Sequence, residues 1–254
     1  MRVTLLPIDI AWDNPHENIS RAEKMMMETP LADLYVLPEM WATGFAVNPF
    51  GIAEKEETSV ALMWMRQTAL EKQVAVCGSL AIQLSEQTYV NRHYFVTHDC
   101  VFYYDKRHLF THGHEDTYFT AGKQAVIAEW KGFRFLLQTC YDLRFPVFSR
   151  YGRAGEYDAI IYVANWPQQR QSAWDTLLRA RAIENQSYVI GVNRVGVDPM
   201  CAYNGGSVII DPIGRLLSAQ SADISIDKLR EMRLRFRVLD DRDLIDSISD
   251  NNSD

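Results

Sequence analysis

The stretch FRFLLQTCYDLRFP, residues 133–146, carries a cysteine directly after a run of mostly apolar residues. Its first half, Phe133–Thr139, has the length and composition of a buried β-strand, so we predict a strand there. Cys140 then stands where the strand ends and the chain turns. Side chains just beyond strand ends are well placed for binding and catalysis, so Cys140 is a candidate nucleophile. The ordinary alternative for a single cysteine is a buried core thiol.

Two charged side chains follow other predicted strands in the same way. Glu39 comes after DLYVLP (33–38), and Lys106 comes after VFYYD (101–105). Taken singly, a glutamate after a proline is more often a surface carboxylate, and a single lysine is more often solvated. Together with a cysteine they satisfy a mechanism, because a thiol with a pKa of about 8.5 is only partly ionised at neutral pH. A carboxylate can take its proton, and an ammonium can hold the thiolate that attacks an amide or nitrile carbon.

The same groups can complete the reaction. The ammonium, with a backbone N–H next to the cysteine, can stabilise the oxyanion that develops on the attacked carbon. The carboxylate, now protonated, can give its proton to leaving ammonia and later activate water. The chemistry expected of this set is therefore hydrolysis of a small carbon–nitrogen bond.

The hydrophobic pattern predicts more strands than helices, and several strands follow one another as hairpins. Two sheets packed together with helices outside fit this pattern better than a purely alternating fold. The predicted strands are residues 2–9, 33–37, 75–84, 89–97, 101–104, 133–139, 159–164, 188–193, 207–211 and 216–219. The predicted helices are a segment capped by Asn18 or Ser20 that runs through Met27, and residues 59–72, 148–153 and 172–185. Residues 107–124 show no clear period and are predicted as a long functional loop.

The composition is ordinary for a globular protein, with 47% hydrophobic residues, 23% charged residues and a net charge of -7. No basic stripe is present, so nucleic acid is an unfavourable partner. No apolar stretch is long enough for a membrane span, and the first residues lack the features of a signal peptide, so we expect a cytoplasmic protein. One domain is predicted over residues 1–240, followed by an acidic tail over residues 241–254.

Three short motifs resemble those of a known enzyme family. LPEMWATGF (37–45), YYDKRHLF (103–110) and QTCYDLRFP (138–146) are similar, in order and spacing, to the motifs of the nitrilase, or carbon–nitrogen hydrolase, superfamily. The further stretches that agree with it are GHEDTYFTAG (113–122), LLRARAIENQSYVIGVNRVG (177–196) and GGSVIIDPIGRLLSA (205–219). The resemblance implies an α/β fold, a four-layer α-β-β-α sandwich of two mainly β-sheets packed face to face with helices outside. It also implies a homodimer, or a higher homo-oligomer, formed through the outer helices.

The resemblance implies roles for individual residues. Glu39, Lys106 and Cys140 match the catalytic glutamate, lysine and cysteine of the family. Glu115, in HGHEDT, matches the second glutamate that is often counted as a fourth catalytic member. The oxyanion donors would be the Lys106 ammonium and the backbone N–H of Tyr141. Enzymes of this family need no metal and no organic cofactor.

Within the superfamily, the motifs look most like those of the bacterial omega-amidase branch. Those enzymes hydrolyse the terminal amide of small 2-oxo dicarboxylic monoamides, such as 2-oxoglutaramate or 2-oxosuccinamate, to the acid and ammonia through a cysteine thioester. An acidic substrate needs cations or amide donors in its pocket. The candidates near the proposed site are Arg144, Gln168, Gln169 and Arg170. We also expect Trp166 and Phe119 to contact the substrate. An arginine at these positions is, however, more often a structural ion-pair partner than a substrate contact.

Other readings remain open at this point. The substrate could instead be an N-carbamoyl compound, an aliphatic amide or a nitrile, since all of these use the same catalytic set. A non-catalytic scaffold of the same fold is a further alternative, because several tryptophans could build an interface as well as a pocket. These tryptophans are Trp41, Trp64, Trp166 and Trp174.

Metal and serine chemistry are less favoured by the sequence. His108, His112 and His114 precede Glu115, but Gly113 interrupts the run and the spacing is not that of H-E-x-x-H. No G-x-S-x-G motif is present for a serine nucleophile. The cysteines show no C-x-x-C spacing and predict no disulfide framework. They are Cys77, Cys100, Cys140 and Cys201.

Overall fold

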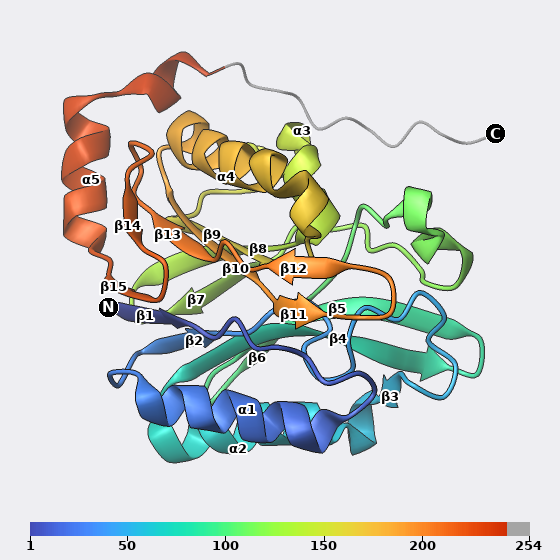
Figure 1. Cartoon of the computed structure of the whole chain (residues 1–254). Coiled ribbons are helices and arrows are strands. Elements are labelled where there is room, and N and C mark those ends of the chain that lie inside the picture. Colours follow the sequence, from blue (N-terminus) through green and yellow to red (C-terminus); the bar gives the residue numbers. More distant parts are fainter. Residues whose placement is uncertain (243–254) are drawn as a thin grey trace.

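The computed structural model describes residues 1–242, and most of its strands belong to two large sheets (Figure 1). The strands of the first sheet are β1 (Arg2–Leu5), β2 (Leu34–Val36), β3 (Glu54–Lys55), β4 (Ala75–Ser85), β5 (Thr88–Val96), β6 (Val101–Asp105) and β15 (Ser221–Asp223). Those of the second are β7 (Ile127–Trp130), β8 (Phe133–Thr139), β9 (Ala159–Ala164), β10 (Tyr188–Asn193), β13 (Val208–Ile210) and β14 (Leu216–Ser218). The strand orders are β15-β1-β2-β4-β5-β6, with β3 beside β4, and β14-β13-β10-β9-β8-β7.

The central strands of both sheets run parallel. β1, β2 and β4 are parallel neighbours in the first sheet, and β8, β9 and β10 are parallel neighbours in the second. The carboxyl ends of parallel strands meet at one edge of a sheet, which is where loops carry functional side chains in open α/β sheets. This arrangement brings the residues after β2, and those after β8 and β9, to the edges of their sheets where a site can form.

Alternation of side chains along the strands buries both faces of each sheet. Phe135 and Leu137 of β8 lie in the apolar cluster between the sheets, together with Val3 of β1. Leu136 points to the opposite face and packs in a second cluster with Trp174 of the helix α4 (Gln171–Asn185). The near-continuous apolar runs of the strands follow from this two-sided burial.

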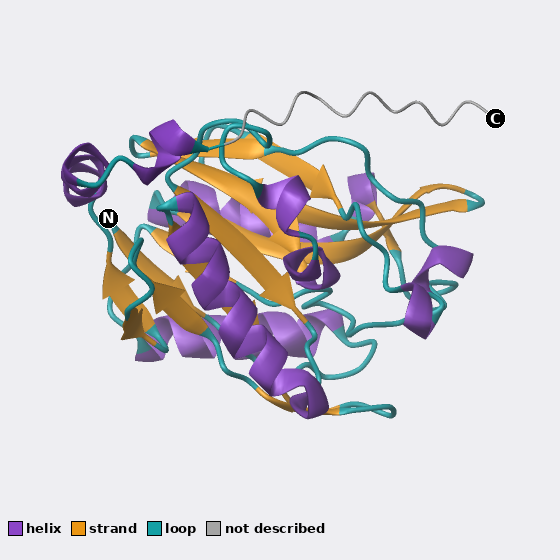
Figure 2. Ribbon diagram, turned by 90° about the horizontal axis from the view of Figure 1, so that it is seen from above, coloured by secondary structure: helices purple, strands orange, loops and turns teal. Residues whose placement is uncertain are grey.

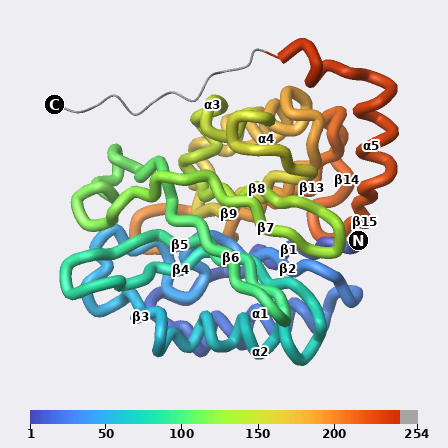
Figure 3. Tube along the Cα trace, turned by 180° about the vertical axis from the view of Figure 1, so that it is seen from behind, coloured from blue at the N-terminus to red at the C-terminus, as the bar shows by residue number. Residues whose placement is uncertain are grey.

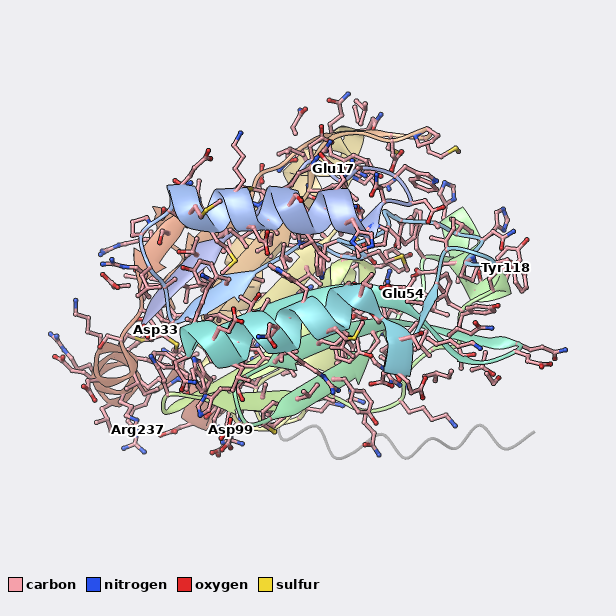
Figure 4. All side chains as sticks on the ribbon, turned by 90° about the horizontal axis from the view of Figure 1, so that it is seen from below. Glu17, Asp33, Glu54, Asp99, Tyr118 and Arg237 are labelled. Atoms are coloured by element: carbon pink, nitrogen blue, oxygen red, sulfur yellow. The ribbon has the colours of Figure 1, made fainter. Side chains whose placement is uncertain are left out.

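Helices cover the outer face of each sheet and complete four layers. α1 (Pro15–Glu28) and α2 (Val60–Lys72) lie side by side on the first sheet, as Figure 4 shows. α4 lies along the second sheet with the short helix α3 (Pro146–Ser149) near it (Figure 2). The predicted α-β-β-α sandwich is therefore confirmed. Another helix, α5 (Ile226–Arg235), lies beside β15 and the N-terminus at one side of the molecule (Figure 3).

Several strands begin and end close to the predicted positions, but some elements were missed. The predicted strands over residues 133–139, 159–164 and 188–193 coincide with β8, β9 and β10. The elements without a prediction are β3, β7, β15, α5 and a hairpin of β11 (Val195–Val197) and β12 (Ala202–Asn204). The missed strands are too short to show a hydrophobic period. α5 is strongly polar, and Leu229 is its one fully buried residue, so it shows no strong helical period either.

Two predicted helices are displaced. α1 begins at Pro15 rather than after Asn18 or Ser20, because Asn14 is the cap and its side chain accepts a hydrogen bond from the Glu17 N–H at 3.1 Å. Asn18 is instead buried inside the helix. The helix predicted over residues 148–153 is α3, which starts at Pro146 and has already ended at Ser149.

The remaining predictions concern the loop, the membrane and the tail. Residues 107–124 form a loop that holds two short 3₁₀ helices, Thr111–Gly113 and Glu115–Thr117. Within residues 1–242, no helix is long and apolar enough to cross a membrane. The part of the predicted acidic tail that follows Arg242 lies outside the described residues.

Candidate active site

Four side chains from separate parts of the chain meet at one end of the sandwich. Glu39 follows β2, Lys106 follows β6 and Cys140 follows β8, as the sequence indicated. Glu115 comes from a 3₁₀ helix in the loop after β6. Glu39, Lys106 and Glu115 are almost completely buried, whereas Cys140 is partly exposed. The structure therefore brings together the four residues proposed as catalytic.

Lys106 lies between the two glutamates. Its Nζ donates to Glu39 Oε1 at 2.8 Å, and to Glu115 Oε1 and Oε2 at 3.1 and 2.8 Å. Burial by itself would lower the pKa of Lys106, but the Glu115 and Glu39 carboxylates outweigh it and raise the pKa above its ordinary value. Lys106 therefore stays charged, as a donor to a developing oxyanion must.

The charge of this cluster is not balanced by one lysine. Burial raises the pKa of Glu115, and the nearby charge of Glu39 adds to this effect, whereas Lys106 opposes it. A short hydrogen bond of 2.6 Å from the Phe110 N–H to Glu115 Oε2 also favours the ionised form. Glu115 is thus a buried acceptor for both the Lys106 ammonium and the Phe110 N–H.

Glu39 has several further partners. Its Oε1 also accepts from Asn91 Nδ2 at 2.8 Å, and its Oε2 accepts from the Asn165 N–H at 2.9 Å. Asn91 lies within β5 and Asn165 directly follows β9. Neither asparagine was among the predicted site residues. Asn165 stands at a strand end, a signal that could have found it, whereas Asn91 carries no such signal.

Cys140 begins a tight turn. Its φ of 45° lies in the left-handed region, which is unusual for a residue with a side chain and is found at strained functional positions. A 3₁₀ helix, Cys140–Arg144, starts here, so the Tyr141 N–H belongs to a first turn that lacks intrahelical acceptors. Burial first, and then the charge of Glu39, raise the pKa of the Cys140 thiol well above its ordinary value, while Lys106 opposes them. The resting thiol is protonated and needs a base.

Asp142 holds the turn that carries Cys140. It is fully buried, and its Oδ2 accepts from the Thr139 N–H at 2.9 Å and the Tyr104 hydroxyl at 2.7 Å. Its Oδ1 accepts from the His108 N–H at 3.0 Å and lies 2.7 Å from His108 Nδ1. Asp142 therefore ties the turn that carries Cys140 to the segment that follows Lys106.

The histidines considered for a metal site have other environments. His108 contacts Asp142 and stacks on Phe145 with ring centroids 4.0 Å apart. His112 lines the cavity beside Cys140, and His114 has a φ of 61° between two 3₁₀ helices. Among residues 1–242, no group of three or more His, Cys, Asp or Glu side chains is arranged to hold a metal ion.

A cavity of about 320 Å³ opens beside Cys140. Glu39, Lys106, Cys140 and Tyr141 form part of its wall. The wall continues through Phe45, Val47, Phe110, His112, Gly113, Arg144, Asn165, Trp166, Pro167, Arg170, Asp198, Met200, Cys201 and Tyr203. The size suits a small molecule, since ligand pockets typically start at about 300 Å³.

Two arginines give this cavity a positive wall. The Arg144 guanidinium lies 4.9 Å from the ring centre of Trp166, and that of Arg170 lies 5.1 Å from the ring centre of Phe110. Within residues 1–242, neither arginine forms an ion pair with a carboxylate, in contrast to the structural role weighed for them from the sequence. Asp198 also lines the cavity, but it accepts from the Tyr203 hydroxyl at 2.6 Å. The arginines are therefore available to an acidic ligand.

The other predicted contacts divide into two groups. Arg144, Trp166 and Arg170 line the cavity. The wall does not include Phe119, which packs with Met40, Tyr89 and Leu109 in a separate apolar cluster. It also lacks Gln168 and Gln169, which lie exposed in a short 3₁₀ helix. These three stand near the site in sequence, but the chain directs their side chains elsewhere.

The tryptophans and cysteines also have defined places. Trp41 and Trp174 are fully buried, as core residues are, and Trp64 packs on Trp41 with ring centres 5.2 Å apart. Cys77 is buried with its Sγ 2.9 Å from His93 Nε2, Cys100 is exposed and Cys201 lines the cavity.

Comparison with known proteins gives consistent relatives over most of the chain. Residues 2–227 match the carbon–nitrogen hydrolase family. The chain is 40% identical to the omega-amidase YafV of Yersinia enterocolitica, over 96% of this chain and 97% of that protein. It is 34% identical to a 2-oxoglutaramate amidase of Bacillus subtilis, over 94% and 96% of the two chains. A CN-hydrolase superfamily protein of Xanthomonas campestris, solved with an arsenic adduct in its active site, superposes with a TM-score of 0.89 at 36% identity, covering 96% of this chain and 97% of that one.

Proposed function

The chain belongs to the carbon–nitrogen hydrolase family, and we propose that it hydrolyses the terminal amide of a small 2-oxo dicarboxylic monoamide, such as 2-oxoglutaramate or 2-oxosuccinamate. The products are the 2-oxo dicarboxylic acid and ammonia. What supports this function most strongly is the buried contact of Lys106 with Glu39 and Glu115 beside Cys140, at the wall of a cavity that also holds two unpaired arginines. The names of two relatives, an omega-amidase and a 2-oxoglutaramate amidase, agree with it.

The first half of the reaction forms a thioester. The Cys140 thiol loses its proton to Glu39, and the sulfur attacks the amide carbon of the substrate. The oxyanion that develops accepts hydrogen bonds from the Lys106 ammonium and the Tyr141 N–H. Glu39 then donates its proton to the amide nitrogen, the carbon–nitrogen bond breaks and ammonia leaves.

The second half releases the acid. Glu39, ionised again, takes a proton from water, and the water oxygen attacks the thioester carbon. The same two donors stabilise the second oxyanion. The carbon–sulfur bond breaks, and the thiolate recovers its proton from Glu39. Glu115 acts as the fourth member by holding the Lys106 ammonium in position.

Arg144 and Arg170 bind the far carboxylate of the substrate. A guanidinium offers paired donors that match a carboxylate, and the aromatic rings of Trp166 and Phe110 fix the two arginines in place. A neutral amide of similar size lacks this contact, so the arginines select for acidic substrates.

Ammonia release from a small panel tests the substrate assignment. The panel contains 2-oxoglutaramate, 2-oxosuccinamate, glutamine, asparagine, an N-carbamoyl amino acid and a simple nitrile, with the Cys140→Ala protein as blank. Release from the two oxo-amides alone supports the proposal. Release only from another member contradicts the substrate and leaves the catalytic set in place.

Glu39→Gln tests the assignment of the base. The variant lacks an acceptor for the thiol proton, so both halves of the reaction should fail. A burst of one equivalent of ammonia followed by a stall would show that another group, with Glu115 the first suspect, serves as base in the first half.

We also infer that the protein acts as a homodimer, as the family resemblance implies, and that it is cytoplasmic, as the sequence led us to expect. Sedimentation velocity at micromolar concentrations checks the assembly. A dimer across this range supports the inference, and a monomer across the same range contradicts it.

A further inference from the structure

Glu39 and Glu115 share a second donor besides Lys106. It is the side-chain amide of Asn91, in the middle of β5, whose Nδ2 donates to Glu39 Oε1 at 2.8 Å and to Glu115 Oε1 at 3.2 Å. Asn91 is fully buried. One buried amide group therefore donates to both carboxylates.

The direction of the amide is fixed by a chain of donors. The Met40 N–H donates to Ser79 Oγ at 2.9 Å, and Ser79 Oγ donates to Asn91 Oδ1 at 2.8 Å. A backbone N–H can only donate, so the serine oxygen accepts there and its own hydrogen is directed to the amide oxygen. The amide oxygen therefore faces Ser79, and both amide hydrogens face the carboxylates.

The acceptor positions of the two glutamates are filled unequally. A carboxylate offers about four such positions. On Glu115, Oε1 accepts from Lys106 and Asn91, and Oε2 accepts from Lys106 and the Phe110 N–H, so all four are occupied. On Glu39, Oε1 accepts from Lys106 and Asn91. Within residues 1–242, Oε2 of Glu39 accepts only from the Asn165 N–H, which leaves one position open.

We propose that Asn91, held by Ser79, is a positioning residue that directs proton transfer from Cys140 to Oε2 of Glu39. The proposal rests on the proposed function and assigns the transferred proton to one atom, Oε2 of Glu39. The S–H bond of Cys140 breaks, an O–H bond forms at Oε2, and the sulfur keeps the electron pair with which it attacks. By occupying Oε1 of both carboxylates, Asn91 also keeps Glu115 saturated, so that Glu115 holds Lys106 and carries no proton.

The amide also stabilises the ionised state of the cluster. The carboxylates of Glu39 and Glu115 face one ammonium, that of Lys106, and the thiol of Cys140. Asn91 adds donor hydrogens that stabilise the negative charge that Lys106 does not balance. Asn91→Asp keeps the shape but replaces the NH2 group, with both donor hydrogens, by one acceptor oxygen of a charged carboxylate beside Glu39 and Glu115. The ionised base should then form only at higher pH, because a like charge favours protonation.

The experiment compares four folded proteins: wild type, Asn91→Asp, Ser79→Ala and the control Asn185→Ala. Asn185 is a buried asparagine of α4 whose side chain bonds the Tyr151 N–H and the Arg181 carbonyl, away from the site. Two pH profiles are measured for each protein, kcat/KM for the amide and the rate at which iodoacetamide alkylates Cys140. The alkylation profile needs no substrate.

The proposal predicts a specific change in both profiles. In Asn91→Asp, kcat/KM falls about 10- to 100-fold, the range for loss of a hydrogen bond to a buried charge. The acidic limb of both profiles moves up by about one pH unit. Ser79→Ala frees the amide to turn and gives a smaller loss in the same direction. Asn185→Ala lowers the thermal midpoint and leaves both acidic limbs in place.

Contrary results distinguish a failure of the role proposed for Asn91 from a failure of the proposed function. If Asn91→Asp and Ser79→Ala lose activity only in proportion to their folded fraction, with unmoved acidic limbs, Asn91 is a structural residue and the proposal is overturned. If Asn91→Asp does not fold, the acidic limb of Ser79→Ala decides in the same way. If wild type releases no ammonia from any amide, the proposed function fails, while the alkylation profiles still decide the role of Asn91.

Discussion

Glu39 and Asn165 are joined by two hydrogen bonds across the two sheets. The Asn165 N–H donates to Glu39 Oε2 at 2.9 Å, and Asn165 Nδ2 donates to the Glu39 carbonyl oxygen at 2.6 Å. One residue follows β2 of the first sheet and the other follows β9 of the second. The proposed base is therefore held by the sheet that also carries Cys140, so the two reacting groups keep a fixed relative position.

Asn165→Ala tests this link. The variant loses the bond to the Glu39 carbonyl but keeps the backbone N–H, so we expect kcat to fall about tenfold. Asn18→Ala is the matched control, because Asn18 is also buried and its side chain bonds the Ala11 and Ala42 carbonyls. Steady-state kinetics and thermal melts are compared. Equal kcat in the two variants at similar stability would refute the positioning role.

Lys106→Met removes the ammonium that lies between the buried carboxylates of Glu39 and Glu115. We expect kcat to fall by about 10² to 10³, as for loss of an oxyanion donor. The free energy of unfolding should fall by about 3–5 kcal/mol at neutral pH, since breaking a buried pair leaves uncompensated charge. The exposed Lys123 of the same loop provides the control, Lys123→Met.

The stability of Lys106→Met should depend on pH with a defined sign. Burial and Glu39 already raise the pKa of Glu115 in the folded protein, and loss of the lysine removes the opposing effect. The folded state then binds protons more tightly than the unfolded state, so stability falls as pH rises above about 4.3, the ordinary value for glutamate. Urea unfolding between mildly acidic and neutral pH measures this. A variant that gains stability as pH rises would contradict the assignment.

The Cys140 thiol gives a second prediction on pH. Its pKa is raised in the folded protein by burial and by Glu39, so folding favours the protonated thiol. This contribution is fully present below the ordinary thiol value of about 8.5 and is lost as pH rises above it. Wild type should therefore lose stability relative to Cys140→Ala at alkaline pH. Cys100→Ala, at an exposed cysteine, should follow wild type; parallel stability curves for wild type and Cys140→Ala would refute the prediction.

Arg144→Leu and Arg170→Leu test the recognition of an acidic substrate. Each should raise KM for the oxo-amide about tenfold or more and change kcat little, because the contact is present before and during reaction. Wild-type kcat/KM should also fall with added salt, which screens attraction to the positive wall. Arg230→Leu, on the exposed face of α5, is the control. Unchanged KM in both cavity variants would remove the arginines from the site.

The positions of strand ends in the sequence predicted most of the proposed catalytic set. Glu39 and Cys140 follow β2 and β8, whose parallel neighbours bring such strand ends to one edge, whereas Lys106 follows β6, which pairs antiparallel with β5. Glu115 lies in a loop without period, so only the family resemblance pointed to it. The pairing of Lys106 with both glutamates depends on how the loop folds back, which no local pattern encodes.

The missed residues have physical explanations. Asn91 lies inside a strand, where a polar side chain predicts nothing until its neighbours on other strands are known. Gln168 was expected near the proposed site, and Phe119 was expected to contact the substrate. Side-chain direction depends on backbone turns, and these send Gln168 to solvent and Phe119 into a separate apolar cluster.

The most direct test of the account is ammonia release by wild type and Cys140→Ala at equal folded concentration, with 2-oxoglutaramate as substrate. Circular dichroism and thermal melts establish that the variant is folded. Wild type should release ammonia, and the rate for Cys140→Ala should equal that of the blank without enzyme. A folded Cys140→Ala protein that releases ammonia as fast as wild type would contradict the cysteine mechanism.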